Sequence, residues 1–377
     1  MAVDNERYHG LDALRAIAMI LGIVVHASLP FFDTRGIWPS DEYESPLIQS
    51  IFSFIHLWRM PLFFLISGFF TFVVIKKRGK LYWTKQRTFR LVMPLVIFVP
   101  VLALIMPLVW HYGEKGNFDD VGFSSWEFSP YHLWFLVHLL LFIPMVGIGW
   151  LFSWVARKLC RGKSLNFSWL VSRVIYTKIP IAFILLLIPI LLPSGSELIL
   201  NPLGSFLFFV FGYGLASRND FLSNLSKNWP KYTAMAILVF LLHEYWAYSH
   251  VYQYEAEYLQ NEEGLNGIAN LVWYACLKPL STILFSYALL GFSLDKFNMF
   301  NNKWRFLSDA SYFIYIAHLP VVTIVSFYLL EFSIPIEIKF IISIIATLAL
   351  SLITYIYFVR GTVLGLILNG KRRSSSR

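Results

Sequence analysis

The sequence of 377 residues is poor in charge and in cysteine. Only 14% of its residues are charged and 57% are hydrophobic, against about 25% and roughly 45–50% in ordinary soluble domains, so a single soluble core is excluded. Cys160 and Cys276 lie far apart and have neither the CxxC nor the His-paired spacing of zinc or redox sites, which also sets aside disulfides. Despite the net charge of +9, too little polar sequence remains for a solvated basic face, and this argues against nucleic-acid binding.

What the sequence does contain is a series of apolar runs, each long enough to cross a bilayer, which takes about 20 residues. Polar breaks separate them, and no break is long enough for a separate soluble domain. We therefore expect an all-α polytopic membrane protein of about ten transmembrane helices that forms a single domain over residues 1–377. The expected spans are 10–29, 48–75, 88–111, 131–156, 179–193, 202–217, 230–250, 265–291, 306–330 and 336–366.

The basic residues predict how these spans are oriented, because Lys and Arg accumulate in short cytoplasmic loops. With the N-terminus inside, 25 of the 31 Lys and Arg residues fall on the cytoplasmic side, whereas three fall outside and three lie within spans. An even number of spans then places the C-terminus in the cytoplasm as well. The first run stays a membrane helix rather than a signal peptide, because it contains Asp12 and Arg15 and no small-residue cleavage site follows.

Ionisable residues inside spans cost about 2.5–3.5 kcal/mol each, so those that persist usually line a cavity. Arg15 and His26 are eleven residues apart on the first span, which is about three turns, so both lie on one face with ~16 Å between them. Asp12, three residues before Arg15, can pair with it. A structural Asp–Arg pair with an interfacial histidine is the alternative interpretation of the same spacing.

Other spans bring further polar residues to the depth of His26, in the outer half of the membrane. A lone histidine in an apolar helix is commonly packed against a carbonyl, but five at one depth indicate a polar cavity. No His pair stands at i, i+4, and Glu244 is the only carboxylate at this depth, so no metal site is expected. The additional residues are His56 and Arg59 in the second span, His132 and His138 in the fourth, and His318 in the ninth.

A basic segment, KKRGKLYWTKQRTFR, follows the second span on the cytoplasmic side. Its last basic residues, Arg87 and Arg90, lead into the third span ahead of Pro94. These charges can serve orientation alone or bind anionic lipid headgroups. The alternative is a phosphate-rich cytoplasmic ligand held by Arg forks, to which Arg15 would also contribute.

Five motifs of this sequence resemble those of the acyltransferase family 3 membrane proteins. They are LDALRAIAMILGIVVHA, PLFFLISGFF, RTFRLVMP, HLWFL from His132 and LSDASYFIYIAHLP, which contains His318, and in order they cover about residues 8 to 320. The resemblance implies a protein of the bacterial inner membrane that moves acyl groups from cytoplasmic acyl-CoA to hydroxyls on the far side. The compact length and HLWRMPLFFLISGFF are most similar to members that succinylate osmoregulated periplasmic glucans.

The resemblance also implies roles for individual residues. His26 would be the general base that takes the proton of a glycan hydroxyl, which suits an imidazole. Acyl-CoA would be a co-substrate, with no permanently bound cofactor, and its phosphates would lie against Arg15, Arg87 and Arg90 near Asp12. Many family members carry an acid after the tryptophan of HLWFL, but WFLVHLLLF has none, so no acidic partner for the histidine is identified. The candidates that orient the imidazole or bind the oxyanion are Ser67, His132 and His318.

The acyl group is also open to prediction from charge. A succinyl group ends in a carboxylate, which needs a cation at membrane depth, whereas acetyl would leave that cation unpaired and costly. Arg59 is the first candidate, with His56 assisting, and Lys278, directly before Pro279, is the second. His138 completes the expected acyl or acceptor pocket.

Two alternatives remain open at this point. The acceptor can be another envelope glycan, such as a lipid-linked sugar, lipopolysaccharide or a peptidoglycan precursor, with acetyl-CoA as donor. A secondary transporter is the other, although transporters often show internal repeats and paired broken helices, and the sequence shows neither.

Overall fold

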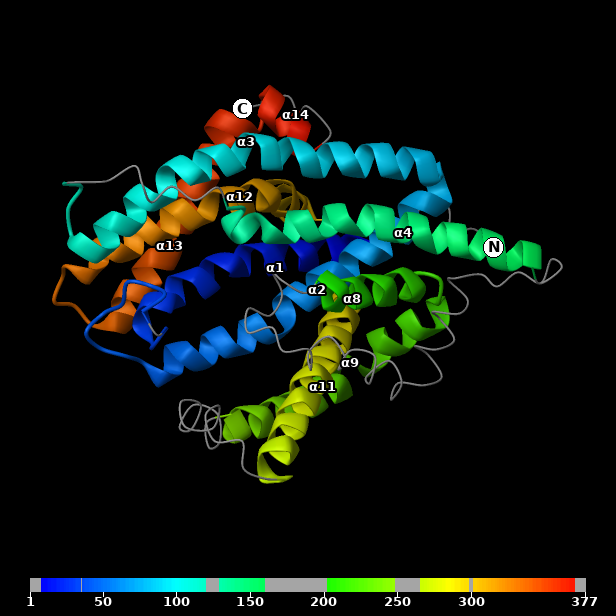
Figure 1. Ribbon diagram of the computed structural model, residues 1–377, viewed down its shortest axis with the longest axis horizontal. Coiled ribbons are helices and arrows are strands. Elements are labelled where there is room, and N and C mark those ends of the chain that lie inside the picture. Colours follow the sequence, from blue (N-terminus) through cyan, green and yellow to red (C-terminus); the bar gives the residue numbers. More distant parts are fainter. Residues whose placement is uncertain are drawn as a thin grey trace. The chain divides into compact units, whose positions relative to one another are not determined.

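The computed structural model describes residues 8–34, 36–119, 129–159, 202–247, 265–297 and 301–369. Within these ranges the chain is helical and contains no strand (Figure 1). The chain divides into two compact units. The first unit consists of Met1–Leu14, Leu57–Lys80 and Pro144–Met299, and the second of Arg15–His56, Leu81–Ile143 and Phe300–Arg377.

Seven helices of the described residues are long and apolar enough to cross a membrane, and they match seven of the expected spans. The basic segment was expected to be a loop, but its first three residues, Lys76–Arg78, end α2 (Pro46–Arg78). Helix α3 begins at Lys80, within the same segment, and is continuous to Lys115. The seven segments are His9–Phe31, Pro46–Arg78, Lys80–Lys115, Tyr131–Val155, Leu277–Lys296, Asn302–Leu330 and Ile336–Val359.

Three expected spans do not appear among these seven. The fifth, 179–193, lies outside the described residues. The sixth corresponds to α8 (Pro202–Leu215), which has 14 residues and is therefore shorter than the ~20 residues of a full crossing. The seventh overlaps α9 (Asn219–Ala247), whose first turns are polar, and its last three residues, 248–250, lie outside the described residues. The count of ten spans and the placement of both termini inside thus stay predictions.

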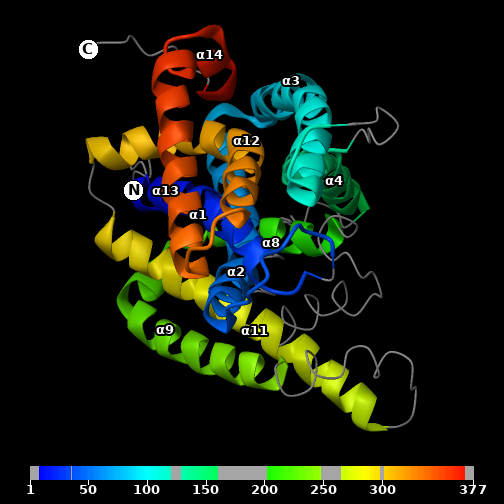
Figure 2. The same cartoon turned by 90° about the vertical axis from the view of Figure 1, so that its left-hand side faces the viewer.

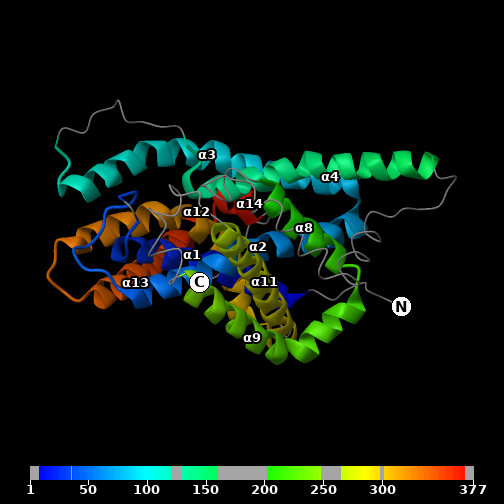
Figure 3. The same cartoon turned by 60° about the horizontal axis from the view of Figure 1, so that its bottom comes forward.

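In the first unit, α9 and α11 (Leu265–Lys296) lie side by side along much of their lengths (Figures 2 and 3). Helix α8 packs against the second half of α2 (Pro46–Arg78) with its backbone in close approach. A Cβ atom on Gly68 would overlap the carbonyl oxygen of Phe209, and one on Gly212 would overlap that of Leu65. The glycine of the PLFFLISGFF motif is therefore required by helix packing.

In the second unit, α12 (Asn302–Leu330) and α13 (Ile336–Thr354) form an antiparallel pair (Figures 1 and 2). The side chain of Asn301 caps α12 by accepting the Lys303 N–H at 2.8 Å. After α13 a π-helical turn, Tyr355–Val359, leads into the short α14 (Val363–Asn369). The guanidinium of Arg90 on α3 donates to the carbonyl of Leu368 at 2.8 Å, which fixes α14 against α3.

Candidate active site

Three histidines from three elements of the second unit lie together. His26 is in the last turn of α1 (His9–Ser28), His132 is in the 3-10 turn Tyr131–Leu133 before α4 (Trp134–Leu159), and His318 is on α12. The ring centroids are 5.2 Å apart for His26 and His318, 4.9 Å for His132 and His318, and 6.4 Å for His26 and His132. We call these three residues the histidine cluster.

The proton position on His132 follows from a proline in α12. Pro320 has no N–H, so the carbonyl of Ile316 has no donor four residues later in the helix. His132 Nε2 lies 3.0 Å from this carbonyl oxygen and 3.0 Å from that of Tyr315. Because carbonyl oxygens only accept, Nε2 carries the proton and Nδ1 carries the lone pair of the neutral ring.

Tyr315 fixes two members of the histidine cluster at once. Its hydroxyl donates to the His132 carbonyl at 2.5 Å, and its own carbonyl accepts from His318 Nδ1 at 2.5 Å. His318 therefore holds its proton on Nδ1, which makes Nε2 the basic nitrogen of the neutral ring. Tyr131, beside His132, has a φ of 45°, a left-handed conformation that side chains rarely adopt and that marks a turn held by its surroundings.

The three rings differ in accessibility. His132 is 5% exposed and His318 is fully buried, whereas His26 is half-buried. His26 is thus the most exposed ring of the histidine cluster, and the protons of the other two rings are fixed by backbone carbonyls. This arrangement suits proton transfer at His26, whose imidazole lies against two buried imidazoles.

A second polar group of the same unit contains the three arginines singled out in the sequence. Arg15 on α1 and Arg87 and Arg90 on α3 are half-buried and lie close enough for their charges to interact. The Tyr312 hydroxyl donates to the Arg90 carbonyl at 3.0 Å and joins α12 to this group. We call Arg15, Arg87 and Arg90 the arginine cluster, and three like charges at short range favour a bound anion.

The remaining polar candidates of the second unit have identifiable aromatic neighbours. His56 on α2 stacks on Phe52, with centroids 5.0 Å apart and an interplanar angle of 16°. His138 on α4 is 2% exposed and contacts the rings of Trp134 and Phe142. These contacts place both imidazoles among aromatic side chains.

Four further candidates belong to the first unit. Asp12 lies on α1, one turn before Arg15, and Lys278 is half-buried on α11. Arg59 is 6% exposed and Ser67 is 4% exposed, both on α2. Burial of a guanidinium at this level is costly, which makes Arg59 the most informative of the four.

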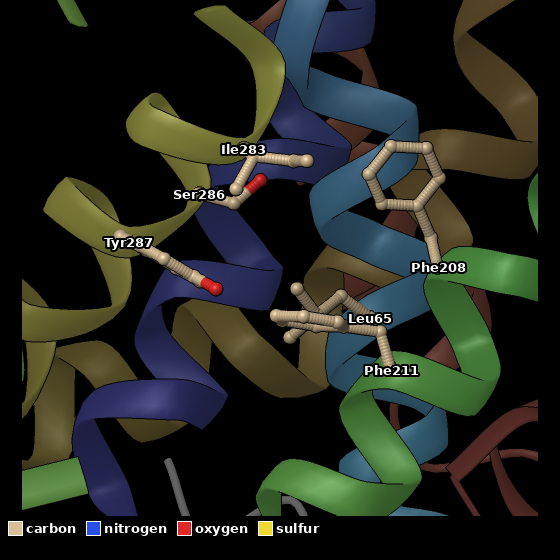
Figure 4. A pocket seen from close by; sticks show the side chains of 6 residues that line it. All are labelled: Leu65, Phe208, Phe211, Ile283, Ser286 and Tyr287. Atoms are coloured by element: carbon tan, nitrogen blue, oxygen red, sulfur yellow. The ribbon is translucent and has the colours of Figure 1, made fainter. Parts of the chain in front are cut away.

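The first unit also contains a small apolar pocket with an empty volume of about 200 Å³ (Figure 4). The Ser286 hydroxyl donates to the Thr282 carbonyl at 2.8 Å, so it is occupied within its own helix. No charged side chain lines this pocket, which therefore does not suit phosphate or carboxylate. Its lining residues come from α2, α8 and α11 and are Leu65, Phe208, Phe211, Ile283, Ser286 and Tyr287.

Two residues near the histidine cluster were not found from the sequence. The ring of Trp38 lies 6.0 Å from that of His26 at an interplanar angle of 20°, and Tyr315 bonds His132 and His318. Trp38 stands in the polar segment GIWPSDE, where a lone tryptophan was the available signal. Among the described residues, no three His, Cys, Asp or Glu side chains are arranged to hold a metal ion.

The acyltransferase domain of family 3 matches residues 8–358 of the chain, beyond the expected 8 to 320. The chain belongs to this family. Glucans biosynthesis protein C of Escherichia coli K12 is 26% identical over an alignment of 393 residues, which covers 98% of this chain and 96% of that protein. The corresponding protein of Escherichia coli O139:H28 is 25% identical over 392 residues, with the same shares of both chains. No solved structure matches the chain.

The predicted family is thereby confirmed. Together with the seven candidate spans, membership makes the chain a multi-pass membrane acyltransferase of the acyltransferase 3 family. The histidine cluster and the arginine cluster both lie within the residues that the family covers.

Proposed function

We propose that this acyltransferase moves a succinyl group from cytoplasmic succinyl-CoA to hydroxyls of a periplasmic glucan across the bacterial inner membrane. The observation that supports it most directly is the arrangement on α1, which carries Arg15 of the arginine cluster and His26 of the histidine cluster eleven residues apart. A rise of about 1.5 Å per residue separates them by ~16 Å along the helix. A pantetheine arm is of comparable length, so one donor would contact both clusters.

His26 acts as the general base in this proposal. Its imidazole takes the proton of the acceptor hydroxyl while the hydroxyl oxygen attacks the thioester carbonyl. The new C–O bond forms, the C–S bond breaks, and the CoA thiolate leaves with the proton from the imidazolium. An accessible neutral imidazole is the side chain best suited to both proton transfers near neutral pH.

His132 and His318 serve as positioning residues rather than oxyanion donors. The Nε2 proton of His132 and the Nδ1 proton of His318 already bond backbone carbonyls. A donor engaged in this way is not aimed at a developing oxyanion. Ser67, the third candidate from the sequence, belongs to the first unit, and its proposed role at the oxyanion rests on the PLFFLISGFF motif.

The arginine cluster binds the CoA phosphates. Guanidinium groups bind phosphate through paired N–H donors, and a phosphate-rich ligand would relieve the repulsion among the three side chains. Asp12, one turn from Arg15 on α1, orients that guanidinium.

Arg59 selects the succinyl donor. A guanidinium that is 6% exposed favours a ligand with a carboxylate over the neutral acetyl group. Lys278 is the second candidate for this role, and His56 and His138 line the acyl or acceptor pocket. The glucan acceptor is supported by the name of the relatives that align over nearly the whole chain.

The test supplies purified protein in nanodiscs with succinyl-CoA labelled in the succinyl group and with a soluble glucan. We expect the label to become covalently attached to the glucan, and His26→Ala to abolish the transfer. His111→Ala is the matched control, because His111 bonds the Asp119 carbonyl in an exposed segment. Full transfer activity of His26→Ala would refute the role of His26 as general base. Transport of intact solute without transfer would identify a carrier, and transfer of acetyl alone, or transfer only to another envelope glycan, would correct the donor or the acceptor.

A further inference from the structure

We infer that Trp38, supported by Trp110 and the buried Phe327, forms the subsite that binds a neutral sugar ring of the acceptor beside His26. The inference rests on the proposed function and adds a residue-level site for its acceptor. All of these residues belong to the second unit, as do the histidine and arginine clusters.

The three aromatic side chains come from three segments of the second unit. Trp38 lies between α1 and α2, Trp110 lies on α3 and Phe327 on α12. Trp38 meets Trp110 edge-to-face at 4.6 Å and Phe327 at 6.1 Å, and the latter two are 5.7 Å apart. We call them the aromatic trio, and Trp38 is the member whose ring lies next to His26.

The segment that carries Trp38 is held firmly. Asp41 and Lys339 form an ion pair of 2.6 Å, and both side chains are 5% exposed. The Thr34 hydroxyl accepts the Trp38 backbone N–H at 3.2 Å, which closes a tight turn before the tryptophan. Removing a buried ion pair from water is costly, so the pair mainly serves to hold residues 36–45 against α13.

Close packing against α3 completes the support. A Cβ atom on Gly113 would meet the Phe327 ring and Pro39, the residue that follows Trp38. Glycine at position 113 is what allows this segment to lie directly against α3. A tryptophan preset in this way binds a ligand without an ordering cost at the moment of binding.

The chemistry of the trio fits a sugar. Tryptophan offers an apolar ring, on which the C–H face of a pyranose packs, together with one N–H donor. The Nε1 atom of Trp38 is buried and has no hydrogen-bond acceptor among the described residues. A hydroxyl oxygen of the sugar would provide that acceptor, and buried donors are normally paired.

The charge of the segment that carries Trp38 favours a neutral acceptor. Asp33, Glu42 and Glu44 are exposed on the same segment, while Asp41 is neutralised by Lys339. Arg35 is the single basic residue of positions 29–47 in the sequence. Such an acidic segment repels phosphorylated or carboxylated ligands, so a neutral glucan fits better than a pyrophosphate-linked sugar.

The experiment measures steady-state kinetics of Trp38→Leu and Trp38→Phe with linear glucose hexasaccharides of different linkages as acceptors. We expect Trp38→Leu to raise the acceptor KM about 10-fold or more, as loss of an aromatic anchor does at other binding sites. The acceptor KM of Trp38→Phe should lie between those of wild type and Trp38→Leu, because this variant keeps an aromatic ring and loses the N–H. The KM for succinyl-CoA and its hydrolysis without acceptor should stay at the wild-type level.

Tyr43→Leu is the matched control, since Tyr43 is an aromatic residue of the same segment that is 70% exposed. Unchanged succinyl-CoA kinetics of Trp38→Leu also exclude misfolding. An unchanged acceptor KM would overturn the inference, and so would an equal fall of kcat for every acceptor and for water, which would assign Trp38 to positioning His26. A wild-type preference for phosphorylated over neutral sugars would refute the neutral subsite.

Failure of the proposed function is detected separately. If wild-type protein transfers no label to any glucan, direct binding of tritiated hexasaccharide to wild type and Trp38→Leu still tests the subsite. Binding that is lost in Trp38→Leu supports the subsite without the reaction, and equal binding by the two proteins refutes it.

Discussion

Two hydrogen bonds join His132 and Tyr315, and each residue donates one of them. The Tyr315 hydroxyl donates to the backbone carbonyl of His132 at 2.5 Å, and the His132 ring donates to the backbone carbonyl of Tyr315 at 3.0 Å. Because the Tyr315 carbonyl also accepts from His318, this reciprocal pair sets two of the three rings of the histidine cluster.

Tyr315→Phe should therefore affect both stability and turnover. Loss of one buried hydrogen bond costs about 1 kcal/mol, with the carbonyl of His132 left without its donor. We expect kcat to fall about 10-fold, because small misplacements of positioning groups are costly, while the KM for succinyl-CoA stays constant. Thermal unfolding in detergent and steady-state kinetics measure the two effects. Tyr328→Phe, an exposed tyrosine on the same helix, is the control. A lower Tm with unchanged kcat would reduce Tyr315 to a structural residue.

Arg87→Leu should weaken recognition of the CoA phosphates. Wild-type protein should use succinyl-CoA far better than succinyl-pantetheine, which lacks the nucleotide phosphates. In Arg87→Leu the preference for succinyl-CoA over succinyl-pantetheine should be about 10-fold smaller, since one guanidinium–phosphate contact is lost. The ratio of kcat/KM for the two donors is the measurement, and Arg78→Leu, an exposed arginine at the end of α2, is the control. Equal preference in Arg87→Leu and wild type would remove the arginine cluster from the donor site.

Arg59→Leu should reduce the preference for succinyl-CoA over acetyl-CoA by about 10-fold or more, because the carboxylate loses its cation. Arg59→Lys keeps the charge without the planar fork and should retain part of the preference. The two donors are compared in competition, with a shared acceptor. If Arg59→Leu prefers succinyl-CoA as strongly as wild type does, Arg59 does not read the acyl group, and Lys278→Leu becomes the next variant.

Lys339→Met should destabilise the fold, because the buried carboxylate of Asp41 loses its partner at 2.6 Å. Breaking one side of such a pair costs about 3–5 kcal/mol. The combined Asp41→Leu and Lys339→Met variant removes both charges and should recover much of that loss. Thermal unfolding of both single variants and the double variant gives the coupling. Additive losses would show that the two charges do not stabilise each other.

Much of the fold could be predicted from hydropathy. The apolar runs located seven helices that are long enough to cross a membrane, and the motifs placed the chain in its family. Hydropathy does not fix where a helix begins or ends. Helix α8 therefore ends at Leu215 and not at residue 217, and α3 begins at Lys80, inside the basic segment, and not at residue 88. Neither difference follows from local composition.

The sequence predicted a group of five histidines, and three of them are in contact in the structure. Position along a span gives the level of His26, His132 and His318, and the structure brings these three together. The direction in which a helix faces its neighbours depends on packing, so the aromatic neighbours of His138 could not be predicted. Trp38 was missed because its segment has no period, and its place depends on the pair between Asp41 and Lys339, far apart in the sequence.

Because Pro320 has no amide hydrogen, it also restricts proton transfer through His132. The Ile316 carbonyl, left without a helical donor, anchors the Nε2 proton of His132, which cannot pass onward unless its bonds to two carbonyls break. A proton taken up by His26 would therefore leave with the thiolate or with solvent instead of crossing through His132. In the proposed reaction, acyl transfer in an energised membrane would thus not open a route for protons through His132.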